Sequence, residues 1–319
     1  MIWIEPYAGT ASVWLSLLGR VSPLTAYQGG KRAMAPALLR TMGLRAGGGA
    51  SGVILGDAGP WGDVWRVVSM PAGAEAVARM IDVWAVAWPA PREMWLALRE
   101  RSPSAPAGSW RVEDVACYLW LQARQAAGAP VWWSAGWARG DEYGTYPIQP
   151  AGAWQRGQAG ERHHQVGLSF RPVAGPSRNG HLYGVGLTAA GLSRRLRSLH
   201  RHPWPRTIAG SATAAEVLSW ALPLCRPDRV VVYLDPPYVD RTGYILPADR
   251  ADVLDQADRY RAAGALVGIS EAVGLAGDLG AGWHQADLTG EHRGKGAEWL
   301  TLSAPPGPAQ AQLSLLAAV

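Results

Sequence analysis

The sequence predicts an α/β fold in which one sheet is interrupted by an inserted, partly helical region. Apolar runs typical of buried strands alternate with helical spacing near both ends of the chain, whereas this periodicity fades from about residue 129 to about residue 208. With 319 residues, the chain has room for one large domain or two. We therefore expect residues 1–72 and 208–319 to form the sheet domain, and residues 73–207 to form the insert.

The first expected elements are a strand, a tight turn and a helix. Residues 2–4 are an apolar run, and Pro6 ends it because proline has no N–H group for a sheet ladder. Gly9 gives the turn backbone freedom, and Thr10 or Ser12 is placed to cap the helix. Such a turn at a helix N-terminus is typical of a cofactor site, although a purely structural turn fits the same residues.

Two charged residues stand out in the next segment. Lys31 follows the paired glycines Gly29 and Gly30 and suits a carboxylate ligand, whereas a flexible turn with a solvated lysine is the alternative. Lysine is rare in this chain, which favours a role for Lys31. Residues 53–57 read as a second strand that ends in Asp57. An acid at this place holds ribose hydroxyls in nucleotide-binding folds, or else it caps the helix that follows.

Residues 61–125 are expected to be mostly helical. Apolar residues recur there at helical spacing, and loops rich in proline separate the segments. We assign the tryptophans of this region to the core. The helices expected in the first half of the chain span residues 34–42, 63–70, 74–87, 92–101 and 113–127.

A strongly basic block lies between residues 162 and 215. It contains eight arginines, five of the seven histidines and no Asp or Glu, within a chain of net charge +5. Aromatic residues and glycines are interleaved with basic residues, which favours a nucleic-acid-reading region of loops and short elements over a merely solvated surface. His163 and His164 lack further ligands at metal spacing, so we expect no metal site. The arginines assigned to phosphate and base contacts are Arg171, Arg178, Arg194, Arg195, Arg197 and Arg201.

The most informative stretch is the apolar run 230–234 and the turn Asp235-Pro236-Pro237-Tyr238 that ends it. The two prolines force the chain out of the sheet at a strand's carboxyl end, where open α/β sheets bind ligands. Asp235 and the Pro236 carbonyl can accept hydrogen bonds from an exocyclic amine, and Tyr238 can stack on a flat ring. A proline-rich turn with an incidental tyrosine is the alternative. Helices over 216–225 and 249–263 and strands over 265–269, 283–287 and 298–303 complete the expected sheet domain.

Composition argues against several classes of protein. Hydrophobic residues make up 48% of the chain, and no apolar stretch reaches the ~18 residues of a membrane span. The N-terminus lacks the basic leader and apolar core of a signal peptide. Cys117 and Cys225 do not form a CxxC pair, so neither a disulfide framework nor a zinc site is predicted. We expect a cytoplasmic protein.

Four motifs together resemble the adenine-N6 DNA methyltransferases of the DNA adenine methylase family. They are Glu5-Pro6-Tyr7-Ala8-Gly9-Thr10-Ala11, Gly29-Gly30-Lys31, Leu55-Gly56-Asp57 and Asp235-Pro236-Pro237-Tyr238. The segment from Arg293 to Leu300 is also similar to that family's closing segment. The chain departs from the family pattern in two ways. Ala11 stands where the family usually has a second glycine, and the Gly-Gly-Lys segment follows the first motif instead of preceding it.

The resemblance implies a Rossmann-like S-adenosylmethionine-dependent methyltransferase sheet with an inserted target-recognition region that binds double-stranded DNA. Tyr7, Ala8 and Gly9 would line the methionine and sugar end of S-adenosylmethionine. Lys31 would face its carboxylate, and Asp57 would hold its ribose. The residues expected at the cofactor are Glu5, Pro6, Tyr7, Ala8, Gly9, Thr10, Gly30, Lys31 and Asp57, and those expected at the target adenine are Asp235, Pro236, Pro237 and Tyr238.

The function implied by the resemblance is transfer of a methyl group to N6 of an adenine flipped out of the duplex. Cytosine also presents an exocyclic amine, so a cytosine-N4 methyltransferase and an RNA adenine methyltransferase remain alternatives. A DNA-binding protein that keeps the fold without catalysis is a third alternative, because Ala11 narrows the room for the cofactor.

Overall fold

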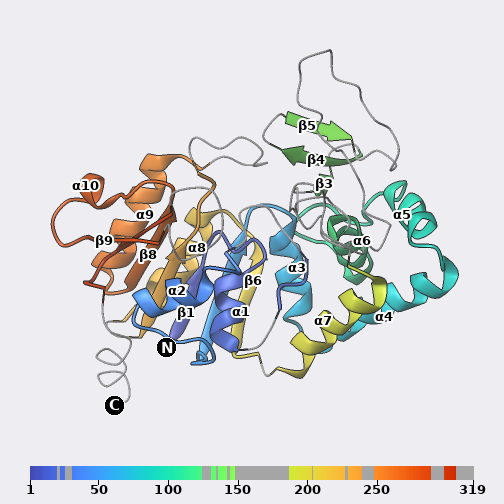
Figure 1. The fold of residues 1–319 in the computed structure, drawn as a ribbon, viewed down its shortest axis with the longest axis horizontal. Coiled ribbons are helices and arrows are strands. Elements are labelled where there is room, and N and C mark those ends of the chain that lie inside the picture. The colour runs from blue at the N-terminus through green and yellow to red at the C-terminus, as the bar shows by residue number, and fades with distance from the viewer. Residues whose placement is uncertain are drawn as a thin grey trace, which may run out of the picture.

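The structure is a computed structural model, and it describes residues 1–19, 22–25, 31–123, 131–133, 136–141, 144–147, 187–202, 204–226, 229–238, 248–288 and 298–306. Its centre is a seven-stranded sheet (Figure 1). The sheet begins at one edge with β6, β2, β1 and β7, and continues through β8 and β10 to β9 at the other edge. The strands, in that spatial order, are Arg206–Ser211, Gly52–Asp57, Ile2–Glu5, Val230–Leu234, Leu266–Glu271, Trp299–Leu302 and His284–Asp287.

The sheet is mostly parallel, which confirms the predicted α/β class. Strands β6, β2, β1, β7 and β8 run parallel to one another, and β10 runs antiparallel to both β8 and β9. Counted in chain order, the first five strands have the order 3-2-1-4-5 that is typical of doubly wound sheets. The fold is therefore compatible with a Rossmann-like sheet.

Side chains alternate between the two faces of the sheet, and each face has its own core. Trp3 and Val231 belong to a cluster with the helices α1 (Ser12–Leu18), α2 (Ala35–Thr41) and α3 (Pro60–Val68). Ile4 and Val232, one position further along, belong to a second cluster with α8 (Ala214–Ala221) and α9 (Arg250–Ala262). The central strands β1, β2 and β7 are buried on both faces, which explains their continuous apolar runs.

Most of the described helices between β2 and β6 lie beyond one edge of this sheet (Figure 1). Helix α4 packs on both α6 and α7, and a small antiparallel sheet, β3-β4-β5, stands beside them. No described helix is long and apolar enough to cross a membrane. The elements not yet given are α4 (Gly73–Ala87), α5 (Pro91–Arg99), α6 (Val112–Ala123), α7 (Ala189–Arg201), β3 (Val131–Trp133), β4 (Trp137–Asp141), β5 (Gly144–Pro147), η2 (Leu222–Leu224) and α10 (Ala276–Leu279).

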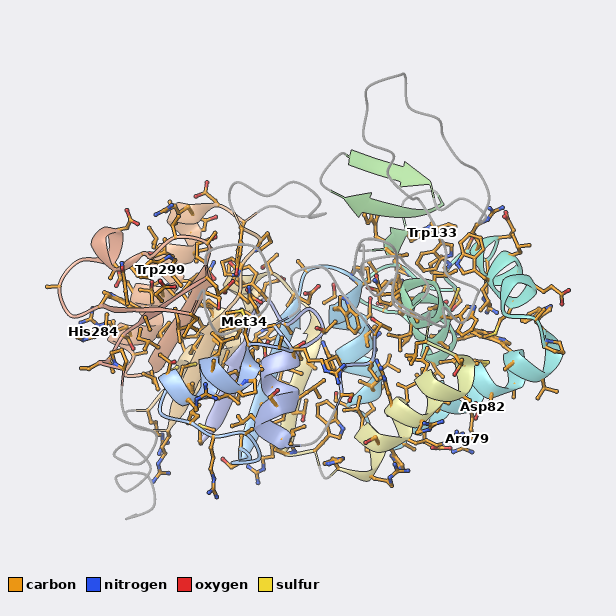
Figure 2. All side chains as sticks on the ribbon, in the orientation of Figure 1. Met34, Arg79, Asp82, Trp133, His284 and Trp299 are labelled. Atoms are coloured by element: carbon orange, nitrogen blue, oxygen red, sulfur yellow. The ribbon has the colours of Figure 1, made fainter. Side chains whose placement is uncertain are left out.

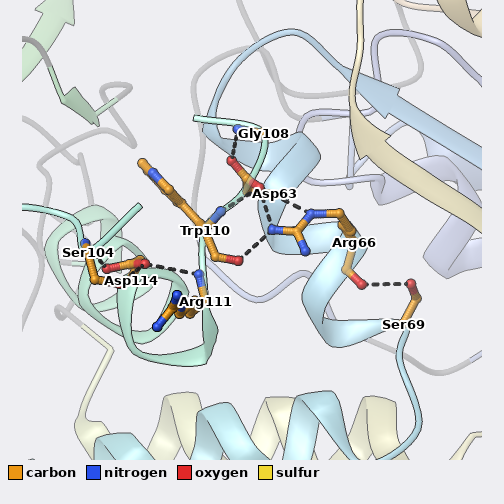
Figure 3. Close-up of polar contacts among 8 residues, drawn as sticks. All are labelled: Asp63, Arg66, Ser69, Ser104, Gly108, Trp110, Arg111 and Asp114. Carbon is orange, nitrogen blue, oxygen red and sulfur yellow. Dashed lines mark hydrogen bonds and ion pairs between the residues drawn. The ribbon is translucent and has the colours of Figure 1, made fainter. Parts of the chain in front are cut away.

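Buried carboxylates join this helical part to α3 (Figure 3). Asp63 is fully buried, and it accepts hydrogen bonds from the Arg66 guanidinium and from the backbone N–H groups of Gly108 and Trp110. Asp114 likewise accepts from Ser104. The Asp63 bonds hold the connection between α5 and α6 against α3, and the Asp114 bonds hold it against α6. The division into a sheet domain and an insert at residues 73 and 207 stays a prediction.

Two elements in the basic block differ from the sequence expectation of loops and short pieces. Helix α7 has 13 residues, begins at the N-cap Thr188, and buries Leu192, Leu196 and Leu199. Its arginines mask this narrow apolar stripe in the sequence. Strand β6 lies at an edge of the sheet, where Ile208 is 45% exposed, so it lacks the apolar run of a central strand.

Candidate functional site

The two central strands β1 and β7 meet at the point where the strand order reverses. From β1 the chain proceeds outward through β2 and β6, and from β7 it proceeds to the other side through β8. Ligands of open α/β sheets bind at this point, outside the carboxyl ends of the strands. Because β1 and β7 are parallel neighbours, Glu5 at the end of β1 and Asp235 after β7 reach the same edge. The structure thus places the first motif beside the Asp-Pro-Pro-Tyr turn.

The glycine turn after β1 is fastened to the end of β2. The Gly9 N–H donates to Asp57 Oδ2 over 2.9 Å, and the Gly59 N–H donates to Asp57 Oδ1 over 2.8 Å. The Trp65 indole donates to the Gly9 carbonyl over 2.6 Å. Burial raises the pKa of Asp57, although the two N–H donors oppose the rise. Asp57 therefore anchors the turn, and its predicted contact with a ribose stays a prediction.

The start of α1 is built differently from the expectation. Neither Thr10 nor Ser12 caps the helix. Their hydroxyls bond to each other over 2.9 Å, and Ala11 is the N-cap residue. Ala11 is fully buried and has φ 46° and ψ 41°, the left-handed region that costs an L-residue roughly 1–2 kcal/mol. A glycine, which the family usually has here, adopts this conformation without that cost.

Glu5 and Tyr7 flank the glycine turn and are both held by neighbours. Glu5 is 2% exposed and accepts a hydrogen bond from the Trp3 indole over 3.0 Å. Burial raises the pKa of Glu5 to about 8, and the nearby Asp235 carboxylate adds to the rise. The Tyr7 hydroxyl lies 3.5 Å from Gln256 Oε1, and burial raises its pKa to about 12. Glu5 is thus mostly protonated at neutral pH, and Tyr7 is neutral.

The Asp-Pro-Pro-Tyr turn lies in a buried cluster of charged groups. Lys31 Nζ is 3.3 Å from Asp235 Oδ1 and 3.1 Å from Glu298 Oε1, and it also contacts the Tyr238 hydroxyl. That hydroxyl donates to Glu298 over 2.8 Å. Lys31, Tyr238 and Glu298 are each at most 9% exposed, whereas the Asp235 side chain keeps 19% of its surface accessible. Asp235 is therefore the member of the cluster best placed to meet a ligand.

The charges in this cluster are strongly coupled. Burial raises the pKa of Asp235 to about 7; Lys31 opposes the rise, and Glu298 and Glu271 add to it. Burial lowers the pKa of Lys31, but Asp235 and Glu298 more than offset that effect, so the pKa lies above its usual value. Lys31 is consequently protonated, and Asp235 titrates near neutral pH.

The structure gives Lys31 partners that the sequence did not predict. We expected its ammonium to face a cofactor carboxylate, but carboxylates of the protein itself surround it. Gly30 lies outside the described residues. Pro236 is buried and Pro237 partly buried, and their role at an adenine stays a prediction, as does that of Tyr238. Because Tyr238 is 9% exposed, stacking on a base would need one face of its ring to open.

The predicted DNA-binding arginines fall into three groups. Arg171 and Arg178 lie outside the described residues. Arg195 donates to the backbone carbonyls of Pro23 and Leu24. Arg197 is bound by carboxylates of α4, Glu75 and Asp82, and the latter is labelled with Arg79 on that helix in Figure 2. Arg194 and Arg201 are exposed on α7. Of the predicted arginines that the structure describes, these last two are the exposed ones.

Glu298, like Glu271, is a site residue to which the sequence assigned no individual role. It immediately precedes β10, and only the antiparallel pairing of β10 with β8 brings it to the carboxyl edge of the parallel strands. Its place in the closing segment of the family resemblance was the one signal available. Within the described residues, no group of three or more His, Cys, Asp or Glu side chains is arranged to hold a metal ion.

Comparison with known proteins adds no family assignment. No family model matches the chain, and no curated protein matches it significantly. The resemblance to adenine methyltransferases therefore rests on the quoted motifs, and the structure by itself establishes an α/β fold with a mostly parallel seven-stranded sheet.

Proposed function

We propose that this chain is a DNA methyltransferase that transfers a methyl group from S-adenosylmethionine to N6 of an adenine flipped out of the duplex. One observation carries the proposal. The Asp-Pro-Pro-Tyr turn leaves β7 beside the glycine turn that follows β1, at the reversal point of a doubly wound sheet. Motifs from opposite ends of the chain thus converge where such sheets bind ligands.

The charge of this edge fits S-adenosylmethionine, which carries a sulfonium. The carboxyl groups of Glu5, Asp235, Glu271 and Glu298 are electrostatically coupled there, and Lys31 is the cation among them. Apart from the mostly protonated Glu5, three carboxyl groups face one ammonium among the described residues of this cluster, and this excess favours a cation. Gly9 and Asp57 would lie at the sugar and methionine end. When bound, the cofactor supplies an activated methyl group.

The residues of the chain would act mainly by positioning. Asp235 and the Pro236 carbonyl would accept hydrogen bonds from the adenine amine and localise its lone pair on nitrogen for in-line attack. As the N–C bond forms and the C–S bond breaks, the amine nitrogen becomes cationic and gives up a proton. Asp235, with a pKa of about 7, is matched to accept that proton near neutral pH.

The decisive experiment is methylation of mixed-sequence DNA and of RNA with methyl-labelled S-adenosylmethionine, followed by identification of the labelled nucleoside. We expect N6-methyladenine from DNA, and complete loss of label in Asp235→Ala. Asp255→Ala, on the exposed side of α9, serves as the matched control with unchanged activity. Label in N4-methylcytosine or only in RNA would replace the proposal with one of its alternatives.

Cofactor binding separates an enzyme from a non-catalytic DNA-binding protein. We expect S-adenosylmethionine to raise the melting temperature of the wild type and of Asp235→Ala alike, since the cofactor binds the folded state. No stabilisation at high cofactor concentration, together with no labelled nucleoside, would favour the binding protein.

A further inference from the structure

We infer that Glu298 is a positioning residue for methyl transfer, which holds Lys31 and Tyr238 so that Asp235 stays available to the amine of the target base. This inference rests on the proposed function. It concerns a residue that lies far along the chain from the Asp-Pro-Pro-Tyr turn, contacts Tyr238 of that turn directly, and reaches Asp235 through Lys31.

Glu298 lies at the site because β10, which follows it, runs antiparallel to β8. The parallel strands β7 and β8 end at the site edge, with Leu234 of β7 paired to Ile269 of β8. Strand β10 runs the other way, and its first residue, Trp299, pairs with Glu271 at the end of β8. The residue before β10 therefore lies at the edge where β7 and β8 end. A backbone hydrogen bond of 2.8 Å from Leu288 to the Glu298 carbonyl fixes it there.

The Glu298 carboxylate bonds to two of the groups that surround Asp235. Both of its oxygens lie 2.8 Å from the Tyr238 hydroxyl, which donates a hydrogen bond to them, and one oxygen lies 3.1 Å from Lys31 Nζ. Lys31 in turn reaches Asp235 Oδ1 over 3.3 Å. Glu298 thus holds the Tyr238 end of the turn directly and the Asp235 end through the ammonium.

Sharing the ammonium between two carboxylates matters for Asp235. Without Glu298, Lys31 would pair with Asp235 alone, which would lower the pKa of Asp235 and draw its carboxylate toward the ammonium. With Glu298 present, Asp235 keeps part of its side chain accessible and titrates near neutral pH. The ionisable groups that act on Asp235 or adjoin it are Lys31 before α2, Glu298 before β10, Glu271 of β8, Glu5 of β1, Tyr233 of β7 and Tyr238 after β7.

The test compares Glu298→Gln, which removes the charge, with Glu298→Asp, which keeps the charge but shortens the reach. We expect Glu298→Gln to lower kcat roughly 10- to 100-fold, as misplaced reacting groups do, with little change in KM for DNA. We also expect the acid limb of its pH profile of kcat to move to lower pH. The Glu298 charge raises the pKa of Asp235, so removing this charge lowers that pKa. Glu298→Asp should lose kcat without that displacement. Glu100→Gln, an exposed glutamate, is the control that keeps both rate and profile.

A second readout does not depend on activity. The carboxyl carbon of Asp235, labelled with ¹³C and assigned with Asp235→Asn, should titrate at lower pH in Glu298→Gln than in the wild type. An unchanged kcat, or a reduced kcat with neither the acid limb nor the Asp235 titration displaced, would overturn the inference. If the wild type methylates nothing, the proposed function fails, and the carbon titration still decides whether Glu298 acts on Asp235.

Discussion

Replacing Glu5 by Gln is expected to change how the stability of this protein depends on pH. Glu5 is 2% exposed, and burial raises its pKa from 4.5 to about 8. Between these values the folded state holds a proton that the unfolded chain has released. The free energy of unfolding therefore falls as pH rises from about 4.5 and levels off above the folded pKa.

The size of the effect follows from the pKa difference. A difference of about 3.5 corresponds to about 5 kcal/mol, at about 1.4 kcal/mol for each factor of ten in proton affinity. Glutamine keeps the oxygen that accepts the 3.0 Å hydrogen bond from the Trp3 indole, but it cannot ionise. Glu5→Gln should thus match the wild type near pH 4, below the unfolded pKa, and exceed its stability by about 5 kcal/mol near pH 9, as the linkage relation requires.

Urea unfolding followed by tryptophan fluorescence, repeated across this pH range, measures the difference between the two proteins. Asp57 and Glu271 also have raised pKa values, but they are present in both proteins and cancel in the difference. Asp235 is coupled to Glu5, so the difference reports the Glu5 titration together with its effect on Asp235. A difference that is independent of pH, or that favours the wild type in alkali, would refute the assignment of a buried, mostly protonated Glu5.

Three further predictions test the packing and the basic helix. Asp63→Asn should lower the free energy of unfolding by about 3–5 kcal/mol, because the fully buried carboxylate pairs with an arginine and accepts two backbone N–H groups; a loss below about 1 kcal/mol would contradict this. Gly62→Ala should cost about 2 kcal/mol or more in the same assay, since its Cβ would lie 2.3 Å from a backbone oxygen of β2, whereas Gly277→Ala, with nothing within 4 Å, should stay within about 0.5 kcal/mol. Arg194→Ala should weaken DNA binding and reduce its salt dependence by about one phosphate contact, whereas Arg197→Ala should not, because Glu75 and Asp82 already bind Arg197; equal losses in fluorescence polarisation would show that Arg197 also reaches DNA.

The positions of the strands were predictable where the strands are buried on both faces. The run from Val230 to Leu234 is continuous because both sides of β7 face a core, and the prolines after it mark the strand's end. The same logic located β1 and β2. It failed for β6, because an edge strand with exposed positions has no such run, and for α7, because three leucines among arginines are a weak signal.

The individual motifs of the site were predictable, but their contacts were not. Asp57 was expected at a ribose, and the structure shows that its carboxylate accepts a hydrogen bond from the Gly9 N–H, 48 residues away in the chain. Lys31 was expected at a cofactor carboxylate, and it pairs with Asp235 and Glu298. Contacts of this kind depend on which strands are neighbours and on the direction of β10. Neither property can be predicted from the spacing of residues within one segment of the chain.

The placement of Lys31 also bears on the order of the motifs along the chain. Lys31 and Glu298 are 267 residues apart, yet both reach one turn after β7. The site is formed by residues next to β1, β7, β8 and β10. Each of these residues contributes to the site because it lies at the carboxyl edge of the parallel strands. A segment that enters this edge from before or after β1 can deliver the same ammonium, provided that its connections are long enough. Lys31 can therefore reach the site although the Gly-Gly-Lys segment follows the first motif instead of preceding it. The position of this segment in the sequence is not by itself an argument against the proposed function.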